Sequence, residues 1–260
     1  MAHCLTEIEQ DAYYFKEHFR RKHQSSHTFK TTSSCLHSST QSLRKKSPPW
    51  LASNAHRRII FSDESPFSIE EVFNKQNTRI LAPTIQAANQ AGRVTARAAF
   101  PMRTVVWGGI SANGKTPLLF IDSKVKINQA VYQQQVLQPF RDHWAPALFP
   151  DGNWIFQQDS APAHRGRASQ MFCERHFPDF LHHTEWPSNS PDLNPLDYSI
   201  WGILKDKACT TRHRSLEALK ASLQRAWNDI DIDVLRATVD SFPKRLRACV
   251  RARGGRFESV

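Results

Sequence analysis

The chain has few cysteines, and their spacing suits neither a disulfide scaffold nor a complete metal site. No Cys-x-x-Cys pair occurs among the five, which are Cys4, Cys35, Cys173, Cys209 and Cys249. An odd number of cysteines without a signal peptide indicates reduced thiols in an intracellular protein. Cys173 and His176 have the spacing of some zinc ligands, but no second pair completes four ligands, so a core role is favoured for Cys173.

Long apolar runs are also missing. No stretch approaches the roughly 18 residues needed to cross a bilayer, so we expect no membrane partner. Acidic residues are outnumbered, because 24 Asp and Glu stand against 35 Lys and Arg, giving a net charge of +11 and a pI of about 9.7. This balance suits binding to a phosphate backbone and agrees with a nucleic-acid partner without establishing one. No small-molecule substrate is expected.

Part of the basic charge is clustered near the end of the chain. Six basic residues occur there without an intervening acid: Lys244, Arg245, Arg247, Arg251, Arg253 and Arg256. A solvated helix face explains such a run as well as DNA contact does, and both interpretations stay open. The weak candidates for DNA binding in this cluster are Arg245, Arg247, Arg251 and Arg253.

Two aspartates each close a short hydrophobic run that is typical of a buried strand. The runs are Arg58–Asp63 and Trp154–Asp159, rich in β-branched and aromatic residues. Folds built from such strands place ligands at strand ends. An aspartate after a strand is usually a turn residue, so neither Asp63 nor Asp159 alone identifies a site.

A third aspartate, Asp197, is predicted near the start of a helix. Asn194 and Pro195 are favoured there as the N-cap and the first helical residue. The apolar residues that follow recur at helical spacing, namely Leu196, Ile200, Trp201 and Leu204. Taken alone, Asp197 is a capping acid stabilised by the helix dipole.

Three carboxylates placed in this way suggest a two-metal site for phosphoryl transfer. Hard divalent ions prefer carboxylate oxygen and keep several waters, so a few converging acids suffice. Two ions about 3.5–4 Å apart can activate an attacking oxygen and stabilise the leaving one. We therefore expect the side chains of Asp63, Asp159 and Asp197 to converge, with no cysteine or histidine ligand needed.

Four motifs surround these acids in order. They are Phe61–Phe67, Val105–Ser111, Gln157–His164 and Trp186–Tyr198. Together they resemble the catalytic domain of the Tc and mariner superfamily of DNA transposases, over about 56–257. Because 37 residues separate Asp159 from Asp197 and the third acid is Asp, the chain is most similar to the mariner-related maT group.

The resemblance implies a ribonuclease-H-like α/β fold, a five-stranded mixed sheet flanked by helices. The first acid would lie on the first strand, the second just after the fourth strand, and the third on a later helix. It also implies a DDE/D-type transposase that cuts DNA with water and joins the freed 3′-hydroxyl to new DNA. Two Mg²⁺ or Mn²⁺ ions would be used, with Asp63 bridging them and Asp159 and Asp197 each holding one. DNA as the partner and the nucleus as the location follow from the same resemblance.

Local patterns fit this fold. Two apolar runs, 103–111 and 116–122, are joined by Ala112–Lys115, where Asn-Gly predicts a hairpin. Segment 127–149 repeats large apolar residues at four-residue steps and predicts an amphipathic helix. Further along, we expect a helix over 164–176 and a strand over 180–186. A helical tail over 215–253 is predicted to break near Pro243.

Two segments fall outside the regular pattern. The polar 68–101 segment resembles the clamp loop of the family, which implies a homodimer formed through it; a surface loop without a partner is the alternative. Residues 1–50 form a predicted poorly ordered arm, because half of the 24 residues from Gln24 to Ser47 are Ser or Thr. Members of the family carry helix-turn-helix units before the catalytic domain. We expect none here, as in an N-terminally truncated copy, with residues 51–260 forming the catalytic domain.

Competing interpretations remain for the function and for His164. A catalytically silent, transposase-derived module that binds DNA is one alternative, and a ribonuclease-H-like nuclease cutting RNA in hybrids is another. The Trp186–Tyr198 motif argues against the hybrid nuclease. His164 could orient the site, touch DNA or cap the following helix. Trp107 and Gly108 are predicted to serve packing in the sheet.

Overall fold

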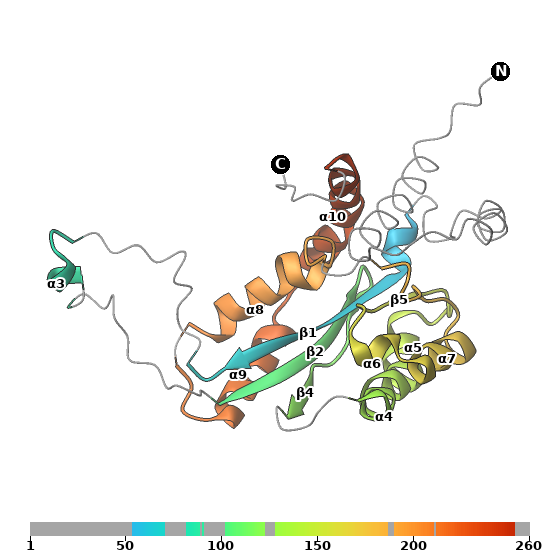
Figure 1. Ribbon diagram of the computed structural model, residues 1–260, viewed down its shortest axis with the longest axis horizontal. Helices are drawn as coiled ribbons and strands as arrows, with labels where there is room; N and C mark the ends of the chain where they lie inside the picture. Colours follow the sequence, from blue (N-terminus) through green and yellow to red (C-terminus); the bar gives the residue numbers. More distant parts are fainter. Residues whose placement is uncertain are drawn as a thin grey trace, which may run out of the picture.

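The computed structural model describes residues 54–70, 82–88, 90, 102–122, 128–186, 190–210 and 212–252 (Figure 1). The predicted arm of residues 1–50, most of the 68–101 segment and Arg253 lie outside these ranges. None of the helices in the described part is both long and apolar enough to cross a bilayer.

A five-stranded mixed sheet forms the centre of the fold, as the sequence predicts. Its strands are β1 (Ile59–Ser68), β2 (Arg103–Ser111), β3 (Gly114–Lys115), β4 (Leu119–Asp122) and β5 (Ile155–Gln157). The central strand β1 pairs antiparallel with β2 and parallel with β5. Both β3 and β4 pair antiparallel with β2. The predicted hairpin therefore forms, but its return strand is divided where Thr116 and Pro117 leave the ladder.

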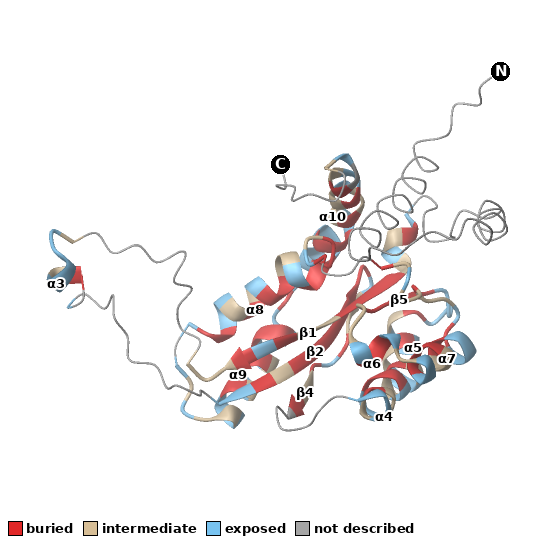
Figure 2. Cartoon of the chain, viewed as in Figure 1, coloured by how far each residue is buried: buried red, intermediate tan, exposed pale blue. Residues whose placement is uncertain are grey.

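Helices cover both faces of this sheet. Ile59 and Phe61 belong to one hydrophobic core, whereas Ile60 between them belongs to a second core on the opposite face. All three side chains are fully buried, and Figure 2 shows the start of β1 as buried. A strand covered on both sides carries consecutive apolar residues, which explains the run Ile59–Phe61.

One face is covered by the helices that follow β4 and β5. They are α4 (Gln129–Tyr132), η4 (Gln133–Leu137), η5 (Phe140–Trp144), α5 (Ala145–Leu148), α6 (Pro162–Arg165) and α7 (Arg167–His176). The helix expected over 127–149 is present, with wide π-type turns in η4 and η5 and with Val136 and Phe140 buried. The helix expected over 164–176 starts earlier and divides at Gly166.

The opposite face is covered by η6 (Leu196–Ile200), α8 (Trp201–Ala208), α9 (Leu216–Asn228) and α10 (Ile232–Arg251). The predicted break near Pro243 is wrong, because Pro243 lies inside α10. The chain breaks instead at Asp229–Asp231, where the Asp231 side chain accepts a 2.7 Å hydrogen bond from the Asp233 amide. This cap starts a new helix. It has more effect on where the helix breaks than the single backbone donor that is missing at Pro243.

Two further strand predictions are corrected. The strand expected over 180–186 does not form; Phe180 makes only an isolated parallel bridge to Phe156. A turn follows it, in which the His182 amide donates to the Glu185 carboxylate at 2.9 Å, and this local bond replaces strand pairing. Strand β1 also does not stop at Asp63, because pairing with β2 continues to Ser68.

Two short helices complete the described part. The helix η2 (Ala55–Arg58) precedes β1, and α3 (Ile85–Ala88) lies at the left of Figure 1, away from the sheet.

Candidate active site

The three predicted acids come from three elements that meet at one edge of the sheet. Asp63 lies within β1, Asp159 follows the end of β5 by two residues, and Asp197 is in the first turn of η6. Because β1 and β5 are parallel neighbours with Phe61 opposite Gln157, their continuations run side by side. Asp63 and Asp159 are thereby brought to the same end of the sheet.

Asn194 connects the third element to β1. Its side-chain oxygen accepts a hydrogen bond from the Leu196 amide at 3.2 Å, which satisfies one donor at the start of η6. Its side-chain nitrogen donates to the Ser62 carbonyl at 3.3 Å. One buried amide therefore begins the helix that carries Asp197 and fixes that helix next to the residue before Asp63.

Asp63 and Asp197 are in direct contact. Burial and the negative charge of Asp197 raise the pKa of Asp63 to about 8, although a 2.7 Å hydrogen bond from Trp201 Nε1 to Asp63 Oδ2 acts in the opposite direction. The residue Asp197 is exposed at the rim of the site, yet partial burial of its carboxyl also raises its pKa. A hydrogen bond with Asp63 lowers that pKa, and the charge of Asp159 raises it. Two such carboxyls side by side share a proton.

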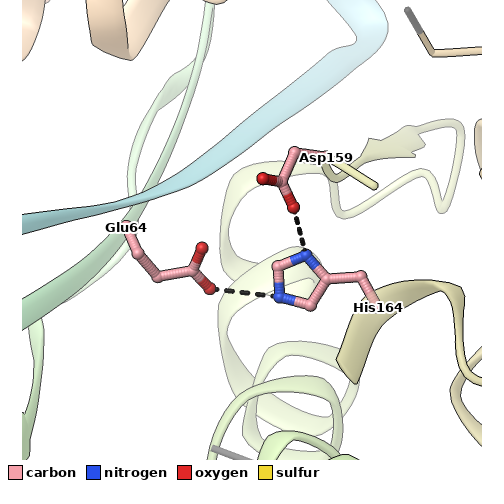
Figure 3. A group of neighbouring side chains, drawn as sticks. All are labelled: Glu64, Asp159 and His164. Atoms are coloured by element: carbon pink, nitrogen blue, oxygen red, sulfur yellow. Dashed lines mark hydrogen bonds and ion pairs between the residues drawn. The ribbon is translucent and has the colours of Figure 1, made fainter. Parts of the chain in front are cut away.

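Asp159 interacts with Asp197 through charge and with His164 through a hydrogen bond (Figure 3). The distance from His164 Nδ1 to Asp159 Oδ1 is 2.5 Å, and His164 Nε2 lies 3.2 Å from Glu64 Oε1. Burial would lower the pKa of His164, but Glu64 and Asp159 outweigh it and raise the value to about 10. Burial would raise the pKa of Asp159, but the hydrogen bond and charge of His164 leave it lowered.

The imidazole of His164 is 4% exposed, which favours a site-orienting role over DNA contact. Its partner Glu64 was not predicted from the sequence. The alternation of side chains along a strand could have indicated it, because Glu64 directly follows Asp63 and must point to the opposite face of the sheet. Asp63 accordingly meets Trp201 of α8, and Glu64 meets His164 of α6.

The donor atoms of the three acids are carboxylate oxygens, which suit Mg²⁺ or Mn²⁺. Burial first and the charge of Asp197 second raise the pKa of Asp63, so a cation at this position would stabilise its ionised form. A second group, Glu64, Asp159 and His164, has one ligand atom from each residue within 4.8 Å. Both nitrogens of its imidazole already face carboxylates, so the aspartate group fits a hard cation better.

The predicted DNA-binding arginines differ in their surroundings. The guanidinium of Arg245 lies 3.8 Å above the Tyr198 ring and donates to the Asp192 carbonyl at 3.1 Å. Arg245 therefore fastens α10 to the loop before η6. Arg247 and Arg251 are exposed on α10. Arg253 lies outside the described residues.

Trp107 and Gly108 lie in the sheet as packing residues. Trp107 is fully buried and stacks on Trp144, with 5.4 Å between ring centroids. A Cβ atom at Gly108 would lie 3.3 Å from Trp201, Trp227 and Leu118. The lack of a side chain at Gly108 lets Trp201 lie against β2, from where its Nε1 reaches Asp63.

The fold and the acids at the sheet edge define a ribonuclease-H-like domain with a carboxylate site. No model of a known protein family matches the chain. It is 32% identical over 151 residues to the Tcb1 transposase of Caenorhabditis briggsae, covering 58% of this chain and 52% of that protein. It is 28% identical over 206 residues to the Tc1 transposase of Caenorhabditis elegans, covering 75% and 68%.

Solved structures of the Mos1 mariner transposase share the fold. The paired-end complex with the left transposon end matches with a TM-score of 0.68 at 21% identity, covering 99% of this chain and 66% of that one. The isolated Mos1 catalytic domain matches with a TM-score of 0.59 at 19% identity and is covered completely. Mos1 paired-end complexes have been determined with Mn and with Mg.

The chain is thus similar in sequence to Tc1-type transposases, and its fold is that of the Mos1 catalytic domain. It spans about half of the Tcb1 protein and about two thirds of the Tc1 protein.

Proposed function

We propose that this chain cleaves DNA strands and transfers them, as a DDE/D-type transposase does, with two Mg²⁺ or Mn²⁺ ions bound by Asp63, Asp159 and Asp197. The observation that carries the proposal is the contact between Asp63 and Asp197, with Asp159 close enough to repel Asp197. Asp63 and Asp197 lie together although the charge of Asp197 opposes ionisation of Asp63, and Asp159 acts on Asp197 through its charge. A bound dication would remove that conflict.

Bound ions would lower the pKa of the attacking hydroxyl and neutralise charge on the scissile phosphate. The residues of the chain supply the geometry. Trp201 holds one oxygen of Asp63, His164 holds one oxygen of Asp159, and Asn194 fixes the helix of Asp197 against β1. Asp63 and Asp197 are therefore presented from a strand and a helix, and Asp159 is held by His164 just after β5, which suits precise placement of charge.

The proposed chemistry consists of two displacements at phosphorus. In the first, water attacks a phosphodiester, a new P–O bond forms, the bond to the 3′ oxygen breaks, and a 3′-hydroxyl and a 5′-phosphate result. In the second, that 3′-hydroxyl attacks a phosphodiester of the target strand, and the 3′ oxygen of the target leaves. In each step the attacking oxygen loses a proton to solvent and the leaving 3′ oxygen takes one up from solvent, and no oxidant or reductant is needed.

The finer assignments belong to the same proposal. DNA is the proposed partner and the nucleus the proposed location, and the third acid and its spacing favour the maT group. A homodimer through the 68–101 segment is supported at its described ends and centre. The amide of Ile69 donates to the Met102 carbonyl at 3.1 Å, closing the base of the segment. In α3 between them, Ile85 is 69% exposed and is the residue at which the dimer contact is proposed.

The test is nicking of supercoiled plasmid with Mg²⁺, Mn²⁺ or EDTA, alongside binding to several DNA duplexes. Wild-type protein should nick only with a divalent ion. The Asp159→Asn variant should lose nicking and keep its DNA affinity, because a ligand charge is removed without loss of a cation. Asp206→Asn on the exposed face of α8 is the matched control and should nick like wild type.

Wild-type protein that binds DNA but never nicks it would support the silent binding module instead. Nicking that survives Asp159→Asn would contradict the assignment of the site. We expect DNA binding to be salt-sensitive and indifferent to sequence. A strong preference for one duplex would reveal a recognition element that the proposal does not contain.

A further inference from the structure

His164 is enclosed on all sides by defined contacts. Its ring lies against the ring of Tyr132, with 4.2 Å between centroids, and the Tyr132 hydroxyl donates to Gln158 Oε1 at 2.7 Å. The carbonyl of His164 accepts a 2.9 Å hydrogen bond from the side chain of Gln170 in α7. Backbone and ring are therefore both held, and the imidazole has one orientation.

This orientation determines which oxygen of Asp159 stays available. Oδ1 accepts from His164 Nδ1 at 2.5 Å and from the Ala161 amide at 3.0 Å. Oδ2 has no hydrogen-bond donor among the described residues. A carboxylate held by two donors on one oxygen cannot rotate freely, so its other oxygen points in a fixed direction.

Glu64 explains why a positively charged imidazole, that of His164, and not a neutral donor, lies beside Asp159. It directly follows Asp63, and its charge contributes to the raised pKa of Asp63. Its Oε1 atom is buried and has no hydrogen-bond partner in the described structure apart from the ion pair with His164 Nε2 at 3.2 Å. A buried carboxylate needs such a partner. His164 separates Glu64 from Asp159 and offsets the charge that both add to the site.

We propose that His164, held by Glu64, is a positioning residue that fixes Asp159 so that Oδ2 alone is presented to the divalent ion, and that the imidazole is not itself a ligand. This inference rests on the proposed metal site. It adds to that site two residues, His164 and Glu64, that orient a ligand without binding the ion. Groups that orient ligands in this way typically contribute about 10–100-fold to metal affinity.

The experiment is an Mn²⁺ titration of the full chain without DNA, with free Mn²⁺ measured by electron paramagnetic resonance. His164→Asn keeps a donor near Asp159 but removes the charge and the contact with Glu64. We expect it to weaken Mn²⁺ binding about 10–100-fold. His143→Asn, an exposed histidine of η5, is the matched control and should bind like wild type.

A double variant distinguishes a loss of metal affinity from a folding defect. His164→Asn leaves Glu64 buried without its cation, so the combination with Glu64→Gln removes that conflict. The double variant should recover the thermal unfolding midpoint without recovering Mn²⁺ affinity. A purely structural role predicts that both recover together, and that result would overturn the proposal.

Electron spin echo modulation of bound Mn²⁺ tests whether His164 is a ligand. The proposal predicts no coupling of a directly coordinated imidazole nitrogen in wild type. A coordinated nitrogen that disappears in His164→Asn would overturn the positioning role and support a site formed by Glu64, Asp159 and His164.

Failure of this inference and failure of the proposed function give different patterns. If Asp63→Asn and Asp159→Asn weaken Mn²⁺ binding but His164→Asn does not, the metal site stands and the positioning role is overturned. If wild type binds no Mn²⁺, or binds it independently of Asp63 and Asp159, the metal site and the positioning role built on it both fall.

Discussion

At the scale of single residues, the site is an electrostatic conflict built into the fold. Burial raises the pKa of both Asp63 and Asp197, and the charge of Asp197 further opposes ionisation of Asp63, although the two carboxyls lie together. Only one donor from the surrounding core, Trp201 Nε1, reaches Asp63 among the side chains described. Strain of this kind occurs at functional sites, and the dication proposed to bind these carboxylates would relieve it.

The conflict predicts a pH dependence of stability in metal-free protein. The pKa of Asp63 is about 8 in the folded chain, against 3.8 for an ordinary aspartate. Between these values the folded state holds a proton that the unfolded state has released. The contribution of Asp63 to the free energy of unfolding should therefore fall as pH rises from about 4 to about 8 and be level above that, while His164, whose pKa is raised to about 10, adds a further decline from about pH 6.5 to about pH 10.

Urea unfolding at several pH values in EDTA measures this dependence. Asp63→Asn should remove the part of the slope that Asp63 contributes, because the amide has no proton to lose, whereas Asp206→Asn should retain it. Saturating Mg²⁺ should oppose the decline, since the ionised pair is the form that binds a cation. A slope that is unchanged in Asp63→Asn would show that Asp63 is ionised throughout.

At the scale of elements, β2 and α8 determine the position of Asp63 together. Gly108 is opposite Asp63 in the antiparallel pair, so both residues face the helix layer that contains Trp201. A Cβ atom at Gly108 would lie 3.3 Å from the Trp201 ring, tighter than ordinary contact. A strand residue without a side chain is thus needed for the hydrogen bond on which Asp63 depends.

Gly108→Ala should destabilise the protein by about 1–3 kcal/mol through overpacking, and it should also reduce metal-dependent nicking by moving Trp201. The control is Gly202→Ala, since a Cβ atom at Gly202 meets nothing within 4 Å and the residue lies within α8. Alanine there should stabilise the helix by about 0.5–1 kcal/mol and leave nicking intact. Thermal unfolding and plasmid nicking measure both effects, and full nicking by stably folded Gly108→Ala protein would refute the link.

The exposed cations of α10 lead to a separate prediction. Arg247 and Arg251 are four residues apart and exposed. Replacing both with Gln should weaken DNA binding at low salt and make its salt dependence shallower, by about one unit of slope for each lost phosphate contact. The metal requirement for nicking should not change.

Gln substitutions at Arg167 and Arg175, which are exposed on α7 in the other helix layer, provide the control. An equal loss of affinity in the two pairs would mean that net charge, and not the face of α10, determines binding.

At the scale of the whole molecule, two hydrophobic cores flank one sheet. Residues of β1 contribute to both, and the remaining members of each core lie between Ala55 and Cys249 among the residues described. The Ser- and Thr-rich segment 24–47 offers little apolar surface to either core. The composition of the chain therefore predicts an arm that is separate from the domain.

Deleting residues 1–50 should leave the thermal unfolding midpoint nearly unchanged, because a polar arm buries little apolar area. Differential scanning calorimetry of the full and shortened chains measures this. A marked drop in the midpoint would show that the first fifty residues pack on the domain.

Much of the fold could be predicted from local patterns. The apolar run Ile59–Phe61 and the Asn113-Gly114 turn identify a buried strand and a hairpin, and Ser215 starts α9 as a cap, accepting from the Ala218 amide at 3.2 Å. Errors arose where short-range bonds compete with periodicity. The turn at His182 replaced a strand, and the Asp231 cap placed the helix break twelve residues before Pro243.

The sequence by itself determined which acids are candidates, because Asp63, Asp159 and Asp197 each stand at the end of a recognisable pattern within an ordered set of motifs. Only the tertiary structure decided that Asp63 and Asp197 touch, that His164 bridges Glu64 and Asp159, and that Arg245 is engaged by Tyr198. Periodicity and capping are local and can be predicted from neighbours in the chain. Contacts between β1, α6 and η6 depend on how two cores pack across one sheet, and no local pattern contains that information.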